Sequence, residues 1–154
     1  MYPFANSRRR GRRGFTLLEM LIVVMYIVIL ATMVLPRLTG VARRASEANL
    51  QATLREIRNA VASFQAETGL YPVQLADITS TQAPDTGLTP GGIEVGIMAN
   101  DFHGPYLLAP GGGLPVDRIN GRREWDYSAT PPNVGRVRSL STGTSLDGEP
   151  YSTF

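Results

Sequence analysis

The chain begins with one long apolar segment, and its hydrophobic pattern changes period after it. Residues 15–35 contain a single charged side chain, Glu19. As a helix this segment would be about 31 Å long at roughly 1.5 Å per residue, close to the hydrocarbon thickness of a bilayer. The pattern therefore predicts a helix that crosses a membrane once.

Apolar residues then recur at every third or fourth position, which predicts that the helix continues to about residue 66. Pro36 lacks an amide hydrogen and predicts a kink, while Gly69 supplies a stop signal. Charged residues are expected to keep the other helix faces in water: Arg43, Arg44, Glu47, Arg55, Glu56 and Arg58. Two apolar stripes result, a small one (Leu38, Val41, Ala45, Ala48, Ala52) and a bulky one (Leu50, Leu54, Ile57, Val61, Phe64).

The bulky stripe must pack against other apolar residues, and residues 67–154 are predicted to supply them. Short apolar runs between turn signals indicate strands of an antiparallel sheet, at 93–98, 106–108, 125–127 and 134–140. Gly- and Pro-rich stretches at 86–92 and 110–115 indicate loops. The expected fold is α+β: a long N-terminal helix, transmembrane and then amphipathic, packed on a small antiparallel β-sheet.

Charge separates the first 14 residues from the rest of the chain. The sequence has 15 basic and 13 acidic residues, a net charge of +2, and residues 1–14 hold five arginines and no acid. Without them the chain carries −3, which argues against nucleic acid as a partner. The positive-inside rule places the N-terminus in the cytoplasm and the downstream domain outside it.

The junction at Gly14 carries the most specific motif. RRRGRRG precedes FTLLEMLIVV, and this order of basic leader, glycine, phenylalanine and glutamate resembles the type III signal of type IV prepilins. The resemblance implies that a prepilin peptidase cleaves between Gly14 and Phe15 and methylates the new amine. It also implies that Glu19 meets the Phe15 amine of a neighbouring subunit, and that Pro36 kinks the helix as in many pilins.

A secretory signal peptide and a plain membrane anchor are the alternatives for this region. A carboxylate in an apolar span costs up to ~3 kcal/mol near the bilayer centre and is usually there for a partner, which neither alternative supplies. We therefore expect four segments: a cleaved leader (1–14), a transmembrane and assembly half-helix (15–35), an amphipathic half-helix (36–66) and a small loop-rich β domain (67–154).

Residues after the helix resemble those of the major pseudopilins of type II secretion. The likeness lies in ETGLYPVQLADI at 67–78 and GPYL at 104–107, and the lack of cysteine also favours pseudopilins over many pilins. It implies a structural subunit, not an enzyme, anchored once in the inner membrane and polymerised into a periplasmic or surface filament. Implied partners are further copies, minor pseudopilins, and the platform and ATPase machinery of the inner membrane. A type IV pilin (major or minor) and a membrane-tethered binding module remain alternatives.

Candidate chemistry elsewhere is sparse. Several major pseudopilins hold calcium in a C-terminal loop, and here Ser145 and Asp147 are the available oxygen ligands. One carboxylate is few for an ion that takes about six to eight oxygens, so an Asp-Gly hairpin turn is favoured and no cofactor is expected. His103, the only histidine, is expected to be a surface or structural residue.

Overall fold

The computed structural model describes the backbone of residues 15–154 and the side chains of residues 15–33 and 40–154. The chain divides into two compact units, Met1–Gly40 and Val41–Phe154. Helix α1 (Leu17–Thr68) contributes to both, and its helical backbone continues through Pro36. The long helix predicted from the apolar spacing is therefore confirmed, whereas the kink at Pro36 stays a prediction.

Among the described residues, none of the helices combines the length and the apolar character that a membrane crossing requires. The span expected over residues 15–35 stays a prediction.

Both ends of α1 follow from local sequence chemistry. At the start, the Glu19 amide donates a hydrogen bond to the Thr16 hydroxyl at 3.2 Å, which satisfies an amide that has no partner inside the helix. At the end, Gly69 takes a φ of +74°, a conformation that glycine adopts without steric cost. Gly69 is thus the stop that the sequence predicts.

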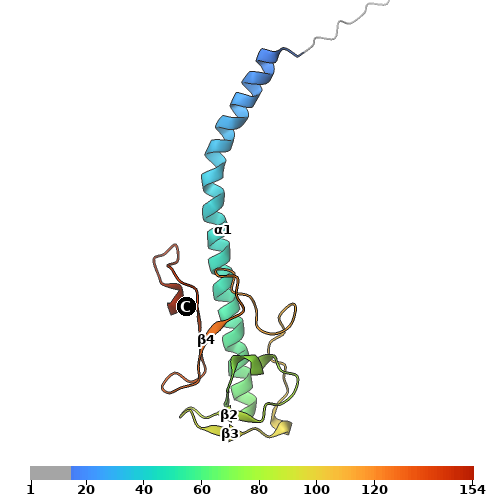
Figure 1. Cartoon of the computed structure of the whole chain (residues 1–154), viewed down its shortest axis with the longest axis vertical. Coiled ribbons are helices and arrows are strands. Elements are labelled where there is room, and N and C mark those ends of the chain that lie inside the picture. The colour runs from blue at the N-terminus through green and yellow to red at the C-terminus, as the bar shows by residue number, and fades with distance from the viewer. Residues whose placement is uncertain (1–14) are drawn as a thin grey trace, which may run out of the picture. The chain divides into compact units, whose positions relative to one another are not determined.

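In the Val41–Phe154 unit, two small antiparallel sheets accompany the helix. Strands β1 (Tyr71–Pro72), β2 (Thr86–Leu88) and β3 (Glu94–Gly96) form the first, in the order β1-β2-β3, near the C-terminal end of α1 (Figure 1). Strands β4 (Trp125–Ser128) and β5 (Arg136–Ser139) form the second. Three short 3-10 helices complete the unit: η1 (Leu75–Thr79), η2 (Ala99–Asp101) and η3 (Tyr151–Thr153).

Three of the four predicted strands are present, as β3, β4 and β5, and the one expected at 106–108 is wrong. The amides of Tyr106 and Leu107 both donate to the carbonyl of Ile78, at 2.9 and 3.1 Å, and so serve η1 instead of a strand ladder. The loop expected at 86–92 contains β2. A Cβ at Gly87 would lie 2.8 Å from the Leu70 Cβ, so glycine here permits the close approach that β2 needs.

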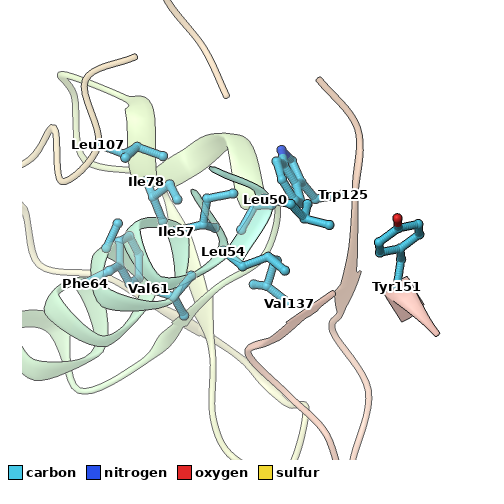
Figure 2. Packing of buried hydrophobic residues seen from close by; sticks show 12 residues of the cluster. Leu50, Leu54, Ile57, Val61, Phe64, Ile78, Leu107, Trp125, Val137 and Tyr151 are labelled. Atoms are coloured by element: carbon cyan, nitrogen blue, oxygen red, sulfur yellow. The ribbon is translucent and has the colours of Figure 1, made fainter. Parts of the chain in front are cut away.

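The bulky stripe of α1 forms the centre of the hydrophobic core, as predicted. Its five residues, Leu50, Leu54, Ile57, Val61 and Phe64, are at most 3% exposed. Around them lie side chains from η1, the loops, β4, β5 and η3: Ile78, Leu107, Trp125, Val137 and Tyr151 (Figure 2). This burial is the main stabilising contribution that holds both sheets on the helix.

Polar contacts fix the two sheets around that core. The guanidinium of Arg58 donates to the carbonyl of Val137 at 2.9 Å, which joins α1 to β5. The Tyr127 hydroxyl donates to the carbonyl of Pro72 at 2.6 Å, which joins β4 to β1. These contacts connect segments far apart in sequence, and apolar burial alone would not fix their register.

Candidate functional site

The residues singled out at the N-terminus fall partly within the described structure. Gly14 lies outside the described residues. Phe15 precedes α1 with its side chain 68% exposed, and Glu19 lies exposed in the first turn. A carboxylate there is favoured by the partial positive charge of the helix N-terminus. The Glu19 carboxylate is thus compatible with the start of the helix, and the intersubunit role that the resemblance implies stays a prediction.

The first unit exposes an unusually continuous apolar surface. Fifteen large hydrophobic side chains between Phe15 and Met33 are each at least 44% exposed. Soluble monomers rarely leave so large an apolar surface in water. This half of α1 therefore needs lipid or another protein surface to cover it.

The small stripe of α1 is also left without a cover inside the second unit. Val41 is 62% exposed, and Ala45, Ala48 and Ala52 are exposed beside it. Small side chains allow a second helix to approach closely. The two stripes thus differ in use, since only the bulky one packs within the chain.

The calcium candidates Ser145 and Asp147 lie in a tight hairpin turn. The Ser145 carbonyl accepts from Gly148 N at 3.1 Å, and the Ser145 amide donates to the Glu149 carbonyl at 2.7 Å. The Ser145 hydroxyl accepts from the amides of Asp147 and Glu149, both at 3.2 Å. The structure therefore has the Asp-Gly hairpin turn that the sequence favours, and Ser145 is engaged in closing it.

A cluster that the sequence did not predict anchors this turn on α1. Glu47 Oε1 accepts hydrogen bonds from the Tyr151 hydroxyl (2.8 Å), the Leu146 amide (3.1 Å) and Arg43 Nε (3.2 Å). Arg43 also donates to the Thr144 carbonyl at 2.6 Å. We call Glu47 and these partners the C-terminal clasp, because they hold the end of the chain on the helix.

The expectation that Glu47 faces water is wrong, since the residue is only 8% exposed. Glu47 lies three positions before Leu50 and so extends the buried stripe by one turn. A carboxylate at such a position needs hydrogen-bond donors from elsewhere in the fold. That spacing was the signal in the sequence that could have revealed the clasp.

Asp117 forms a second buried cluster that sequence reasoning missed. Its side chain is fully buried, and Oδ2 accepts from the hydroxyls of Ser139 (2.8 Å) and Ser141 (2.7 Å). Oδ1 accepts from the Ile119 amide at 2.8 Å. With both carboxylate oxygens satisfied, Asp117 joins the loop before β4 to the last residue of β5 and to the segment that follows it.

His103 is placed as a structural surface residue, as expected. Its Nδ1 lies 3.3 Å from Glu67 Oε2, and its side chain is 70% exposed. Glu67 also accepts a hydrogen bond of 2.6 Å from the Tyr106 hydroxyl, which lowers the pKa of Glu67. These contacts tie the loop after η2 to the end of α1. Across the described part of the chain, no three His, Cys, Asp or Glu side chains gather as a metal site would require.

The C-terminal clasp makes the folding stability of the Val41–Phe154 unit depend on pH in the acidic range. Burial opposes ionisation of Glu47, but hydrogen bonds from Tyr151, Leu146 and Arg43 outweigh it and lower the pKa of Glu47 below its ordinary value of 4.5. The unfolded chain therefore binds this proton more readily, and the contribution of Glu47 is lost as pH falls from about 4.5 through the lower folded pKa.

We expect Glu47→Gln to make the melting temperature less dependent on pH in the acidic range. The measurement is the melting temperature of the Val41–Phe154 fragment from about pH 6 to about pH 3. As pH falls through this window, the melting temperature of wild type should decrease more than that of Glu47→Gln. Glu56→Gln, on the exposed face of the same helix, is the matched control and should follow wild type. Parallel wild-type and Glu47→Gln profiles would contradict the role of the clasp.

The chain is similar to known proteins both in its N-terminal segment and along most of its length. Residues 9–35 match the family model of the prokaryotic N-terminal methylation motif. The type IV wide pilus major component of Thermus thermophilus is 31% identical over 144 residues, which cover 91% of this chain and 97% of that protein.

Proteins named type II secretion system core protein G also match. That of Aeromonas hydrophila is 27% identical over 111 residues, covering 68% of this chain and 78% of that protein. The protein of Xanthomonas campestris pv. campestris is 28% identical over 117 residues, which cover 75% of this chain and 81% of that protein. No solved structure matches the chain significantly.

Proposed function

The chain belongs to the type IV pilin family, and from this premise we propose that it is a structural subunit of the pseudopilus of a type II secretion system. The observation that carries the proposal is the exposed apolar segment that begins at Phe15, includes the first half of α1 and bears one charge, Glu19. Such a surface suits a subunit that rests in lipid and is then covered by the same helix of neighbouring copies. Matches to several core proteins G support the type II assignment.

The proposal assigns a task to each segment of the chain. Residues 1–14 form a basic leader that prepilin peptidase removes. Residues 15–35 anchor the subunit once in the inner membrane, with the N-terminus cytoplasmic, and later form the filament core. Residues 36–66 and 67–154 form the domain outside the cytoplasm. Assembly involves the inner-membrane platform, its ATPase and minor pseudopilins, and gives the chain a structural role without catalysis.

A subunit of a type IV pilus is the second candidate. It is favoured by the Thermus wide pilus component, whose match covers nearly the whole of both chains. Deleting the gene separates the two candidates. A pseudopilin mutant should retain secreted proteins inside the envelope and keep its surface pili, whereas a pilin mutant should lose the pili and still secrete.

Processing at Gly14 is the direct test of the filament proposal. We expect the mature protein to begin at Phe15 with a methylated amine, and Gly14→Val to leave the precursor uncut, because a branched side chain replaces the glycine at the cleavage position. Intact-mass measurement of the membrane-extracted chain reads out both. Gly11→Val, which changes the other glycine of the leader, is the control and should be cut normally. An uncut wild-type chain in cells with active prepilin peptidase would contradict the proposal.

A further inference from the structure

Charge is distributed unevenly over the Val41–Phe154 unit. Between Arg58 and Arg118 the chain contains six acidic residues and no arginine, while nine arginines lie in the rest of the unit. This stretch includes the last turns of α1 and all of β1, β2 and β3, which lie at the C-terminal end of the helix (Figure 1), whereas its sixth acid, Asp117, is buried against Ser139 and Ser141. Within residues 59–117 no lysine or arginine offsets this charge.

Strand β3 presents an apolar edge within the acidic region. It pairs with β2 alone, and Ile93, Val95 and Met98 are 67%, 43% and 74% exposed. Asp85, Glu94 and Asp101 are exposed nearby, and among the described residues none of the three forms an ion pair. We call these six residues the acidic edge. An open strand edge with apolar side chains invites pairing with another chain.

A groove of opposite charge runs beside α1, closer to the start of the unit. It consists of two hollows of about 380 and 220 Å³ that share Asn49 and Arg118 in their lining. Arg123 also lines the larger hollow, and neither hollow is lined by an acidic residue. Arg118 is exposed, and no hydrogen bond or ion pair of its side chain occurs among the described residues. We call this surface the arginine groove.

We propose that the acidic edge of one copy of this chain docks in the arginine groove of the next copy, with Glu94 facing Arg118. The occupant is a second copy because one chain carries both surfaces, with opposite charge and with apolar side chains on the edge. This inference rests on the proposed function, since it describes how subunits contact each other outside the helix bundle.

The positions of the two surfaces also favour an open assembly. Asn49 and the end of α1 at Thr68 are 19 residues apart, about 29 Å along the helix at the usual rise. A contact between different surfaces displaced along one axis is heterologous, and it repeats without closing into a dimer. Successive copies would therefore be offset along the helix direction, as a filament requires.

Cysteine crosslinking of the full chain in cells tests this contact, because the natural sequence has no cysteine. We expect Asn49→Cys combined with Val95→Cys to give a ladder of dimers, trimers and larger species with a short bis-maleimide. A mixture of the two single variants should give dimers only. Absence of crosslinks, self-linked single variants, or crosslinks to another protein in place of a second copy would overturn the proposal.

Charge exchange tests the pairing itself. Glu94→Arg and Arg118→Glu should each lower the yield of sheared filaments by at least about tenfold, since like charges then face each other across the contact. The double variant should restore the yield. Glu56→Arg, an exposed acid on α1 outside both surfaces, should leave it unchanged. Failure of the double variant to recover, with normal membrane levels, would overturn the pairing.

Different experimental outcomes would refute the docking contact and the filament function. Wild-type filaments together with no ladder and no effect of charge exchange would refute the contact and keep the filament function. A ladder from cells in which electron microscopy finds no wild-type filaments would keep the contact and refute the filament function.

Discussion

Replacing Ile57 with aspartate should unfold the Val41–Phe154 unit. Ile57 is fully buried in the stripe that joins α1 to both sheets. Loss of its apolar burial removes roughly 1.5–3 kcal/mol, and a buried carboxylate without a partner costs several kcal/mol more. Together these approach the whole stability of an ordinary domain, about 5–15 kcal/mol. Circular dichroism and thermal melting of a fragment that starts at Val41 measure the effect.

Two further variants make this test specific. Gln51→Asp adds the same charge on an exposed position of the same helix and should leave the fold and its melting temperature nearly unchanged. Ile57→Val removes one methylene group and should destabilise the fragment by about 1 kcal/mol, which remains measurable in a folded protein. A melting curve of Ile57→Asp that overlays wild type would show that this face of α1 does not pack as described.

Replacing Glu19 with glutamine should abolish filaments while leaving membrane insertion and cleavage after Gly14 intact. Near the end of the apolar segment, a carboxylate in a resting monomer can reach the interface and stay hydrated at modest cost. Inside a bundle of apolar helices an unpaired ion costs several kcal/mol, so pairing with the Phe15 amine of a neighbour becomes decisive. The test compares membrane level, N-terminal mass and sheared filament yield with wild type.

Capping of α1 is the competing explanation for Glu19, and the choice of substitutions separates the two roles. Residues 16–19 read Thr-Leu-Leu-Glu, and the Glu19 amide bonds to the Thr16 hydroxyl. Glutamine can act in such a capping box as well as glutamate does, but it carries no charge. Filament loss in both Glu19→Gln and Glu19→Ala indicates charge pairing, whereas loss in Glu19→Ala and Thr16→Val alone indicates capping.

Normal filaments from Glu19→Gln would show that assembly does not need the charge of Glu19. Loss of processed monomer from the membrane would instead assign Glu19 to the stability of the membrane-resident subunit. Either result is distinct from the expected one, in which processed monomer is present at wild-type level and only the filaments are missing.

Local patterns in the sequence determined the helix and the motif that begins it. The period of apolar residues needs no distant partner, so it predicted the course of α1, its end at Gly69 and the buried stripe from Leu50 to Phe64. The order of glycine, phenylalanine and glutamate at the N-terminus is likewise local, and by itself it indicates the family. The roles of Gly14, Phe15, Glu19 and Pro36 stay predictions for experiment.

Tertiary structure alone decided the pairing of distant polar groups and the small sheets. Glu47 meets Leu146 and Tyr151 across about a hundred residues, and Asp117 meets Ser139 at the end of β5 and Ser141 just after it. The spacing of Glu47 to Leu50 indicates that Glu47 is buried, but the partners of both carboxylates leave no periodic trace, because they depend on where segments far apart in the sequence come to lie. The same holds for β1 and β2, which are too short to carry a pattern and are stabilised by their neighbours. Tyr106 and Leu107 have the composition of a strand, yet their amides bond to η1 because packing on Phe64 brings that segment beside Ile78.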